Sequence, residues 1–304
     1  MTAGPMLTIL KTDNGYPRRL AATAGAPEAL FALGEAPLNA PHTIAIVGTR
    51  SATPYALRFI NTLVDSLAAL LPQPVIVSGL ALGCDIMAHR RAVERRLPTV
   101  AVVAHGLQTI YPTAHTQFAR SLVGNRQGML LSAYPEGTPV HRANFLARNK
   151  IIAGISDCVV VAESAADRGG ALHTARYAAS IGRRVFACPG RVGDRYSAGC
   201  NMLIRQGTAS LCESAADLIH AMGWQAAENR PARDNEATQQ TLFAPAPTGP
   251  AAAIAAYLTA SPDSTADAIA AALSLPMGRV LSTLMEMEFL DQVITLPGNR
   301  FRNA

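Results

Sequence analysis

The segment of residues 141–150, HRANFLARNK, brings cations next to an aromatic side chain. Its polar and aromatic members include Arg142, Phe145, Arg148, Asn149 and Lys150. Cations bind the phosphates of a single nucleic-acid strand, and an aromatic ring gives a base a surface on which to stack. The segment therefore predicts a contact with single-stranded nucleic acid. A core position for Phe145 and an ion pair for Arg148 are the structural alternative.

Three other short stretches combine small residues with groups that suit a phosphate. They contribute Gly48 with Arg50, Ser78 with Gly79, and Gly169 with Gly170. Small residues let a phosphate approach backbone N–H groups, above all where a helix begins. We predict phosphate contacts at these stretches, with a buried salt bridge as the alternative for Arg50.

Asp85 and His89 lie four residues apart, so a helix would put both on one face. This spacing can hold a metal ion, but an acidic residue in the first turn of a helix more often binds backbone N–H groups. A histidine one turn later is then often its hydrogen-bond partner. We therefore expect these two residues to brace the structure, and we expect no metal.

Common cofactor and catalytic motifs are missing from the chain. The loops VGTRSATP and SGLALGCD lack the G-x-G-x-x-G pattern of dinucleotide binding, and there is neither a Walker A loop nor a G-x-S-x-G motif. We expect no cofactor and no enzymatic activity.

The positive charge is concentrated in the first part of the chain. Residues 1–224 hold 21 basic and 13 acidic side chains, whereas residues 250–304 hold 3 basic and 5 acidic ones. Nearly all the basic residues of the first part are arginines, whose planar guanidinium groups suit phosphates and bases. This distribution favours a nucleic-acid partner for the first part, with an ordinary solvated surface as the alternative.

The cysteines and the apolar runs indicate the cellular compartment. None of the five cysteines forms a C-x-x-C pair, which favours reduced thiols over disulfides or zinc. No apolar stretch approaches the ~18 residues that span a membrane, and the N-terminus lacks the pattern of a secretion signal. We expect a cytoplasmic protein without a membrane partner.

Short apolar runs alternate with helical patterns from residue 43 onward. Helical stretches such as 55–71 and 172–181 separate predicted strands at 43–47, 75–78, 99–103, 128–132, 158–162 and 185–187. This alternation is typical of βαβ units around a parallel sheet. The sequence predicts an α/β fold, an extended Rossmann-like domain with a parallel-rich sheet. Ligands bind such sheets beyond the carboxyl ends of the strands, where the glycine and arginine stretches lie.

The patterns divide the chain into a lead-in at 1–40, a Rossmann-like core at 41–224, a polar linker at 225–249 and a module at 250–304. The module has three helical patterns and a hairpin with a Pro-Gly-Asn turn, the layout of a small winged helix. Winged helices often bind duplex DNA, but the acidic excess of this one suits phosphates poorly. A duplex-DNA reader remains an alternative for this module.

The stretch RGGALHTA at 168–175 resembles the P-G-G-x-G-T-x-x-E loop of nucleotide phosphoribohydrolases of the LOG type. Leu172 and His173 replace the later Gly-Thr, and Arg176 or Tyr177 stands near the position of the catalytic Glu. A nucleoside-monophosphate phosphoribohydrolase is therefore the alternative from another functional class. The missing Glu opposes it.

A long ordered series of motifs resembles the DNA-processing protein A (DprA/Smf) family across roughly residues 15–225. The motifs are YPRRL, AIVGTR, VSGLALGCDIMAH, GLQTIYP, LSAYPEG, FLARNKIIAGIS, VVVAES, GGALHTA, ACPG and GCNMLIRQG. Residues 250–304 resemble the winged helix that many members carry. Departures from the family's usual Glu, Ile, Asp and Ser occur at Ala133, Cys84, Gln108 and Gly169.

The resemblance implies a core that binds single-stranded DNA without cutting it. Members of the family protect incoming strands during natural transformation, help to load the RecA recombinase onto them, and form homodimers. The resemblance places the DNA contacts at Arg50, Ser78, Gly79, Arg142, Phe145, Arg148, Asn149 and Lys150. These are the loops that the charge and the predicted sheet also select.

Overall fold

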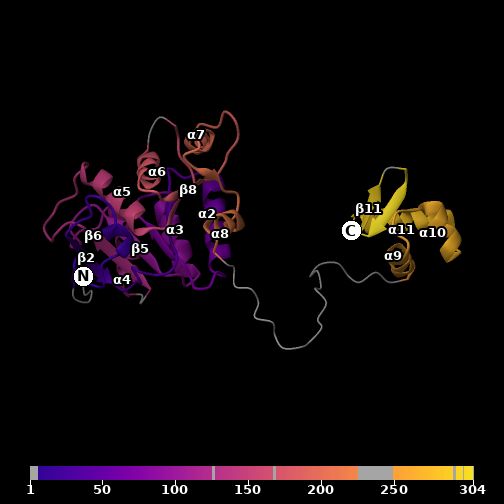
Figure 1. Ribbon diagram of the computed structural model, residues 1–304, viewed down its shortest axis with the longest axis horizontal. Helices are drawn as coiled ribbons and strands as arrows, with labels where there is room; N and C mark the ends of the chain where they lie inside the picture. The colour runs from indigo at the N-terminus through magenta and orange to yellow at the C-terminus, as the bar shows by residue number, and fades with distance from the viewer. Residues whose placement is uncertain are drawn as a thin grey trace. The chain divides into compact units, whose positions relative to one another are not determined.

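The computed structural model describes residues 6–124, 127–166, 169–224, 249–289, 292–296 and 298–303. The chain forms two compact units, Met1–Arg230 and Pro231–Ala304, and each is considered by itself (Figure 1). The predicted linker at 225–249 lies outside the described residues except for Gly249.

The described part of the first unit is built on one sheet with the strand order β1-β2-β6-β5-β4-β3-β7-β8-β9. The strands are β1 (Leu7–Leu10), β2 (Ala29–Gly34), β3 (Thr43–Val47), β4 (Val75–Ser78), β5 (Thr99–Val103), β6 (Gly128–Ser132), β7 (Cys158–Val161), β8 (Arg184–Ala187) and β9 (Ser210–Leu211). From β6 to β9 in this order all neighbours are parallel, whereas β1 and β2 are antiparallel to their neighbours. The predicted parallel-rich α/β fold is confirmed.

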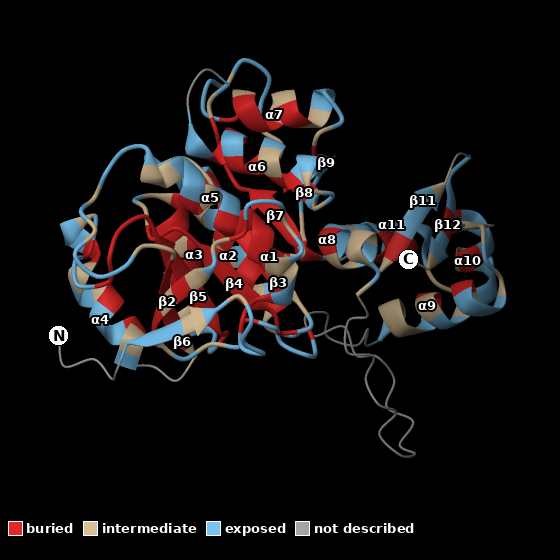
Figure 2. Ribbon diagram, turned by 60° about the vertical axis from the view of Figure 1, so that its left-hand side comes forward, coloured by how far each residue is buried: buried red, intermediate tan, exposed pale blue. Residues whose placement is uncertain are grey.

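Helices cover both faces of the sheet, which explains why its central strands are mostly apolar. Ile44 and Ile46 of β3 pack in a cluster with α2 and α3, whereas Ala45 and Val47 pack in a cluster with α5 and α6. Figure 2 shows the buried strands between these helices. The helices are α1 (Arg18–Ala21), α2 (Pro54–Leu67), α3 (Cys84–Glu94), α4 (Thr116–Gly124), α5 (Asn144–Ile155), α6 (Gly170–Ser180), α7 (Ala198–Arg205) and α8 (Ala215–Met222), with a 3-10 turn at Thr113–His115.

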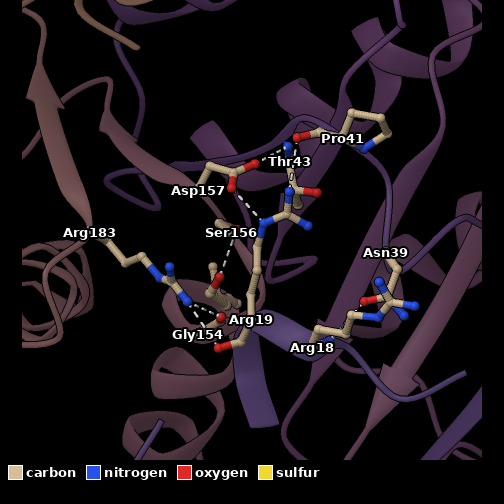
Figure 3. Close-up of polar contacts among 10 residues, drawn as sticks. Arg18, Arg19, Asn39, Pro41, Thr43, Gly154, Ser156, Asp157 and Arg183 are labelled. Atoms are coloured by element: carbon tan, nitrogen blue, oxygen red, sulfur yellow. Dashed lines mark hydrogen bonds and ion pairs between the residues drawn. The ribbon is translucent and has the colours of Figure 1, made fainter. Parts of the chain in front are cut away.

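Residues 6–40 extend the sheet through β1 and β2, two strands that the sequence did not predict. Arg19 of α1 donates a hydrogen bond to the Asp157 carboxylate, and Arg183 donates to the carbonyl oxygen of Arg19 at 2.9 Å (Figure 3). The Asp157 carboxylate also accepts the N–H of Thr43 at 2.8 Å, where β3 begins. These bonds join the N-terminal segment to the amino ends of the central strands.

The strand order creates a crevice between β3 and β7. From β3 the chain adds β4, β5 and β6 on one side, and it then returns to β7 and adds β8 and β9 on the other. The loops that leave β3 and β7 therefore diverge. The opening between them, at the carboxyl ends of the strands, is where doubly wound sheets bind their ligands.

The described part of the second unit packs three helices with a small sheet. The helices are α9 (Pro250–Ala260), α10 (Ala266–Leu273) and α11 (Met277–Phe289), and the strands are β10 (Ser264–Thr265), β11 (Val293–Leu296) and β12 (Arg300–Asn303). Ile254, Ile269, Val280 and Leu284 belong to its core. Across both units, no single described helix is long and apolar enough to cross a membrane, and α10 and α11 pass that test only as a pair bent by 118°.

His89 of α3 is fully buried and bonds to a neighbouring strand. Its Nδ1 lies 2.8 Å from the Thr99 hydroxyl, which itself donates to the Ile76 carbonyl oxygen at 2.8 Å. The hydroxyl must therefore accept from the imidazole, so Nδ1 carries the ring proton. Nε2 is buried and has no hydrogen-bond partner among the described residues. The predicted pairing of His89 with Asp85 is wrong, because Thr99 takes the place of the carboxylate.

We expect acid to destabilise the protein partly through His89. Burial, together with the charge of Arg148, lowers the pKa of His89 from 6.5 to about 3. Because the folded-state pKa is the lower one, the neutral ring contributes its full stability above pH 6.5 and loses it as the pH falls toward 3. By pH 5 this loss amounts to about 2 kcal/mol. Urea unfolding at neutral pH and at pH 5 measures it. His89→Gln should lose less stability between the two conditions, and an equal loss in both proteins would contradict the assignment.

Candidate nucleic-acid interface

A cleft of about 510 Å³ opens at the crevice between β3 and β7. Its walls are the loops after these strands, the first turns of α5 and α6, and the loop after β8. The structure brings seven of the predicted site residues to its lining: Gly48, Arg50, Phe145, Arg148, Asn149, Gly169 and Gly170.

Phe145 lies in the first turn of α5 with its ring close to two cations. The guanidinium carbon of Arg50 is 5.5 Å from the ring centroid, and that of Arg148 is 5.6 Å from it. The ring of Tyr111 lies at 5.9 Å between centroids. Phe145 is half-buried and belongs to none of the hydrophobic clusters of the described residues. It is therefore not a core residue, and its ring can accept a base.

Arg50 is exposed where the chain leaves β3. Its side chain forms no ion pair with the described residues, so the alternative of a buried salt bridge is wrong. Gly48, two residues earlier, packs directly on Cys84 of α3. A Cβ at Gly48 would overlap the Cys84 side chain, so glycine is what allows β3 and α3 to meet here.

Arg148 is buried, with 4% of its surface exposed. Its Nη1 donates to the carbonyl oxygen of Val102 at 2.7 Å and to that of Gly79. Since Val102 belongs to β5 and Gly79 follows β4, the guanidinium group links α5 to the ends of two strands. Burial lowers its pKa to about 10, while the Asp85 charge raises it, so Arg148 stays protonated at neutral pH. Arg148 Nη1 does not make the predicted phosphate contact, because it already donates to two backbone carbonyl oxygens.

Ser78 and Gly79 do not form the predicted phosphate site. The Ser78 hydroxyl is buried and donates to the Ile46 carbonyl oxygen at 2.6 Å. The Asp85 carboxylate accepts the N–H of Gly79 at 3.2 Å and that of Ala81 at 3.4 Å. The prediction is therefore wrong, because a side chain of the protein already occupies the position of the anion.

The bracing role predicted for Asp85 is confirmed by these bonds. Burial raises the pKa of Asp85, whereas the Arg148 charge and the backbone N–H groups lower it. A Cβ at Gly79 would overlap the Arg148 guanidinium and lie 2.7 Å from Asp85 Oδ2. Glycine at this position lets the two opposite charges pack around the same turn. Among the described residues, no three His, Cys, Asp or Glu side chains come together as metal ligands would.

Asn149 connects the two helices that border the cleft. Its Oδ1 accepts from Arg148 Nε at 3.0 Å, and its Nδ2 donates to the carbonyl oxygen of Gly170 at 3.4 Å. Gly169 and Gly170 are exposed where α6 begins, on the lining of the cleft. The predicted anion-binding start of α6 therefore faces the same space as Phe145.

Two of the predicted cations lie outside the lining of the cleft. Arg142 is exposed ahead of α5, and the Nζ of Lys150 lies 5.5 Å from the centroid of the Tyr177 ring on α6. Arg142 and Lys150 thus do not line the cleft with Arg50 and Phe145, although all were predicted as one site.

The loop after β8 contributes two residues that the sequence did not single out. Arg195 and Tyr196 are exposed, line the cleft, and contact each other with the guanidinium carbon 5.9 Å from the ring centroid. The available signal was an adjacent cation and aromatic residue in a loop at the carboxyl end of a predicted strand. This is the same chemistry that singled out residues 141–150.

The fold and the cleft define a Rossmann-like binding protein with arginines and an aromatic ring at the switch point of its sheet. The family model described as DNA recombination-mediator protein A matches residues 7–223, and that of the DprA winged helix domain matches residues 227–299. The chain belongs to the DNA recombination-mediator protein A family. The second match also confirms the predicted winged helix.

Individual relatives agree with this assignment. Protein Smf of Escherichia coli is 34% identical over 294 residues, which cover 94% of this chain and 75% of that protein. The match to the DNA processing protein DprA of Mycobacterium tuberculosis covers half of that relative's length, at 40% identity over 200 residues.

Two solved structures are similar to this chain over part of its length. The DNA processing protein A of Streptococcus pneumoniae has a TM-score of 0.66 and 35% identity, covering 71% of this chain and 74% of its own. The Helicobacter pylori protein, which was solved for its single-stranded DNA binding mode, has a TM-score of 0.64 and 29% identity, covering 72% and 97%.

We expect Arg148→Met to destabilise the fold by about 3–5 kcal/mol, because it leaves the carbonyl oxygens of Gly79 and Val102 without their donor and removes the charge that favours the buried Asp85 carboxylate. Arg50→Ala removes an exposed cation and should change the free energy of unfolding by only about 0.5 kcal/mol. Urea unfolding measures both. The double variant Asp85→Asn/Arg148→Met should recover part of the loss. Equal stability of the Arg148→Met and Arg50→Ala proteins would show that Arg148 is not a structural link.

Proposed function

We propose that the cleft binds single-stranded DNA and that the protein is a recombination mediator, which protects incoming strands during natural transformation. The observation that carries the proposal is the half-buried Phe145 ring beside two guanidinium groups on an open cleft. An aromatic ring stacks on any base, and arginines bind phosphates whatever the sequence. The single-stranded DNA binding mode of the Helicobacter pylori relative supports the same use of the fold.

The lining residues then take different roles. Arg50 and Arg195 bind phosphates, because both are exposed and neither forms an ion pair with a described residue. Phe145 stacks on a base, and the start of α6 at Gly169 and Gly170 offers backbone N–H groups to a further phosphate. The Arg148 guanidinium group, whose carbon lies 5.6 Å from the centroid of the Phe145 ring, holds that ring in place.

A phosphoribohydrolase needs a carboxylate that the described lining of the cleft does not supply. Asp85 is its acidic member, and the Asp85 carboxylate is bound to backbone N–H groups and lies beside Arg148. Glu163, at the end of β7, accepts from the Thr53 hydroxyl at 2.6 Å and the Thr53 N–H at 2.9 Å. We therefore propose binding without catalysis.

The winged helix is not proposed as the DNA-binding part. Its third helix, α11, exposes Leu281, Met285, Glu286 and Glu288, with Arg279 as the accompanying cation. Major-groove recognition depends on side chains that donate or accept hydrogen bonds and on cations that bind phosphates. Apolar and acidic side chains suit a protein surface better. We propose that DNA binding resides in residues 41–224, joined to this module by the linker at 225–249.

We expect Phe145→Ala to weaken the binding of oligo-dT by about 1–3 kcal/mol, the contribution of one stacked base. Arg50→Ala should weaken it as well and reduce the slope of log K against log salt by about 0.7, because one phosphate contact is lost. Fluorescence anisotropy across a salt series measures both effects.

Arg184→Ala is the matched control for this titration. Arg184 is exposed at the amino end of β8, the opposite edge of the sheet from the cleft, so its removal should leave the affinity unchanged. The chain shortened to residues 1–224 should also retain its affinity. An affinity for oligo-dT that does not depend on salt, or that is unchanged in the Arg50→Ala/Phe145→Ala double variant, would refute the proposal.

We propose RecA and a second copy of this chain as protein partners, and the cytoplasm as the location, on the strength of the family resemblance. A mediator should increase the amount of RecA that binds to single strands of DNA already covered by another protein. A gel-shift series with single and double strands, run with and without RecA, tests this. No gain in RecA loading by a protein that binds the strand normally would leave DNA binding intact but remove the mediator role.

A further inference from the structure

A second concavity, a groove of about 710 Å³, lies beside the cleft. One wall is the first turn of α2, with Tyr55 and Arg58. The other wall is the loop after β8, with Pro189, Arg191 and Asp194. None of the residues predicted to bind DNA lines this groove, so it is not part of the site described above.

The cleft and the groove share their walls. In the loop after β8, Arg195 and Tyr196 line the cleft while Asp194 and Ser197 line the groove. After β3, Ser51 belongs to the cleft, and the groove begins two residues later at Thr53. A single strand of DNA that leaves the cleft across the loop after β8 therefore enters the groove directly.

The loop that separates them is held in a defined conformation. Gly190 N–H donates to Asn201 Oδ1 at 3.1 Å, and Asn201 Nδ2 donates back to the Gly190 carbonyl oxygen at 3.0 Å. The Asp194 carboxylate accepts from the Tyr196 N–H at 2.9 Å and from the Ser197 hydroxyl at 3.3 Å. Asp194, the acidic residue of the groove's lining, therefore stabilises the loop that forms the wall.

Tyr55 offers the groove a fixed aromatic surface. Its side chain is 43% exposed, and its hydroxyl donates to the Pro189 carbonyl oxygen at 2.7 Å across the groove. A ring fixed at its hydroxyl end loses little freedom when a base stacks on it. The hydrogen bond with Cys188 and, to a smaller extent, burial raise the pKa of Tyr55 to about 12, so the hydroxyl remains a donor.

Two exposed arginines flank this ring. Arg58 follows Tyr55 by three residues on α2, on the same side of the helix, and Arg191 projects from the opposite wall. Neither forms an ion pair with a described residue, unlike Arg91 and Arg95, which share the Asp65 carboxylate. An aromatic surface between unpaired cations is what a single strand requires, as in the cleft.

We infer that the groove is a second contact for the same single strand, in which Tyr55 stacks on a base and Arg58 and Arg191 bind phosphates. The inference rests on the proposed function, since the strand reaches the groove from the cleft. It predicts that a short oligonucleotide fills the cleft alone, whereas a longer one also occupies the groove.

The test compares oligo-dT of about 5 and about 20 nucleotides, one near the lower end of typical single-strand site sizes and one beyond their upper end. The full chain, the groove variant Arg58→Ala/Arg191→Ala, the cleft variant Arg50→Ala/Phe145→Ala and the control Arg120→Ala/Arg184→Ala are titrated by fluorescence anisotropy. The control removes two exposed arginines remote from both concavities. Thermal unfolding verifies that each variant is folded.

The groove variant should bind the short strand as the unchanged protein does and bind the long strand roughly tenfold more weakly. Its salt slope for the long strand should fall by about 1.4, because two phosphate contacts are lost. Tyr55→Leu should weaken only the long strand, and Tyr55→Phe, which keeps the ring, should weaken it less.

The outcomes separate the two proposals. No binding of either strand by the unchanged protein, or full binding by the cleft variant, overturns the proposed function. Normal binding of the long strand by the groove variant, with the cleft variant impaired, overturns the groove alone. Equal weakening of both strands by the groove variant also overturns it, because the groove would then not be a separate contact.

Discussion

The binding of Asp85 and Arg148 to the backbone around the turn at Gly79 is the arrangement on which the cleft depends. Asp85 binds the N–H groups of that turn, and Arg148 binds its carbonyl oxygen and that of Val102. Without these two side chains, buried N–H and carbonyl groups at the ends of β4 and β5 would lack hydrogen-bond partners. These bonds therefore fix α3 and α5 to the ends of β4 and β5. Phe145, one turn before Arg148, takes its position from this arrangement.

Some arginines form ion pairs and others do not, and this difference explains how a protein of modest net charge can present positive charge at one site. Arg91 of α3 and Arg95, which follows that helix, share the carboxylate of Asp65, and Arg19 binds Asp157. Such surface pairs add little stability, but they neutralise the cations that form them. Arg50 has no carboxylate partner among the described residues, and it stands at the carboxyl ends of the strands where the loops converge. Positive charge is thus available to a ligand at the cleft.

The central strands could be predicted because their information is local. Runs such as Thr43–Val47 and Thr99–Val103 are buried on both faces, so each is apolar after its first threonine, and the ends of both strands coincide with the predicted ones. The strands Leu7–Leu10, at the edge of the sheet, and Ala29–Gly34, next to it, escaped prediction because they lie ahead of the βαβ alternation and are partly exposed. Ala29–Gly34 takes its place in the sheet by pairing with Gly128–Ser132, about a hundred residues away along the chain, and Leu7–Leu10 pairs in turn with Ala29–Gly34.

The sequence by itself determined the fold class, the family and the loops that meet at the cleft, because these depend on residue types in consecutive segments. It identified Arg50 and Phe145 correctly as lining residues, since both follow predicted strands in polar loops. Only the tertiary structure decided which groups remain free to bind a ligand. The N–H of Gly79 is taken by a carboxylate six residues later, and Arg148 is taken by carbonyls from two other strands. A group's partners come from other elements of the fold, so its availability cannot be read from its own stretch of the sequence.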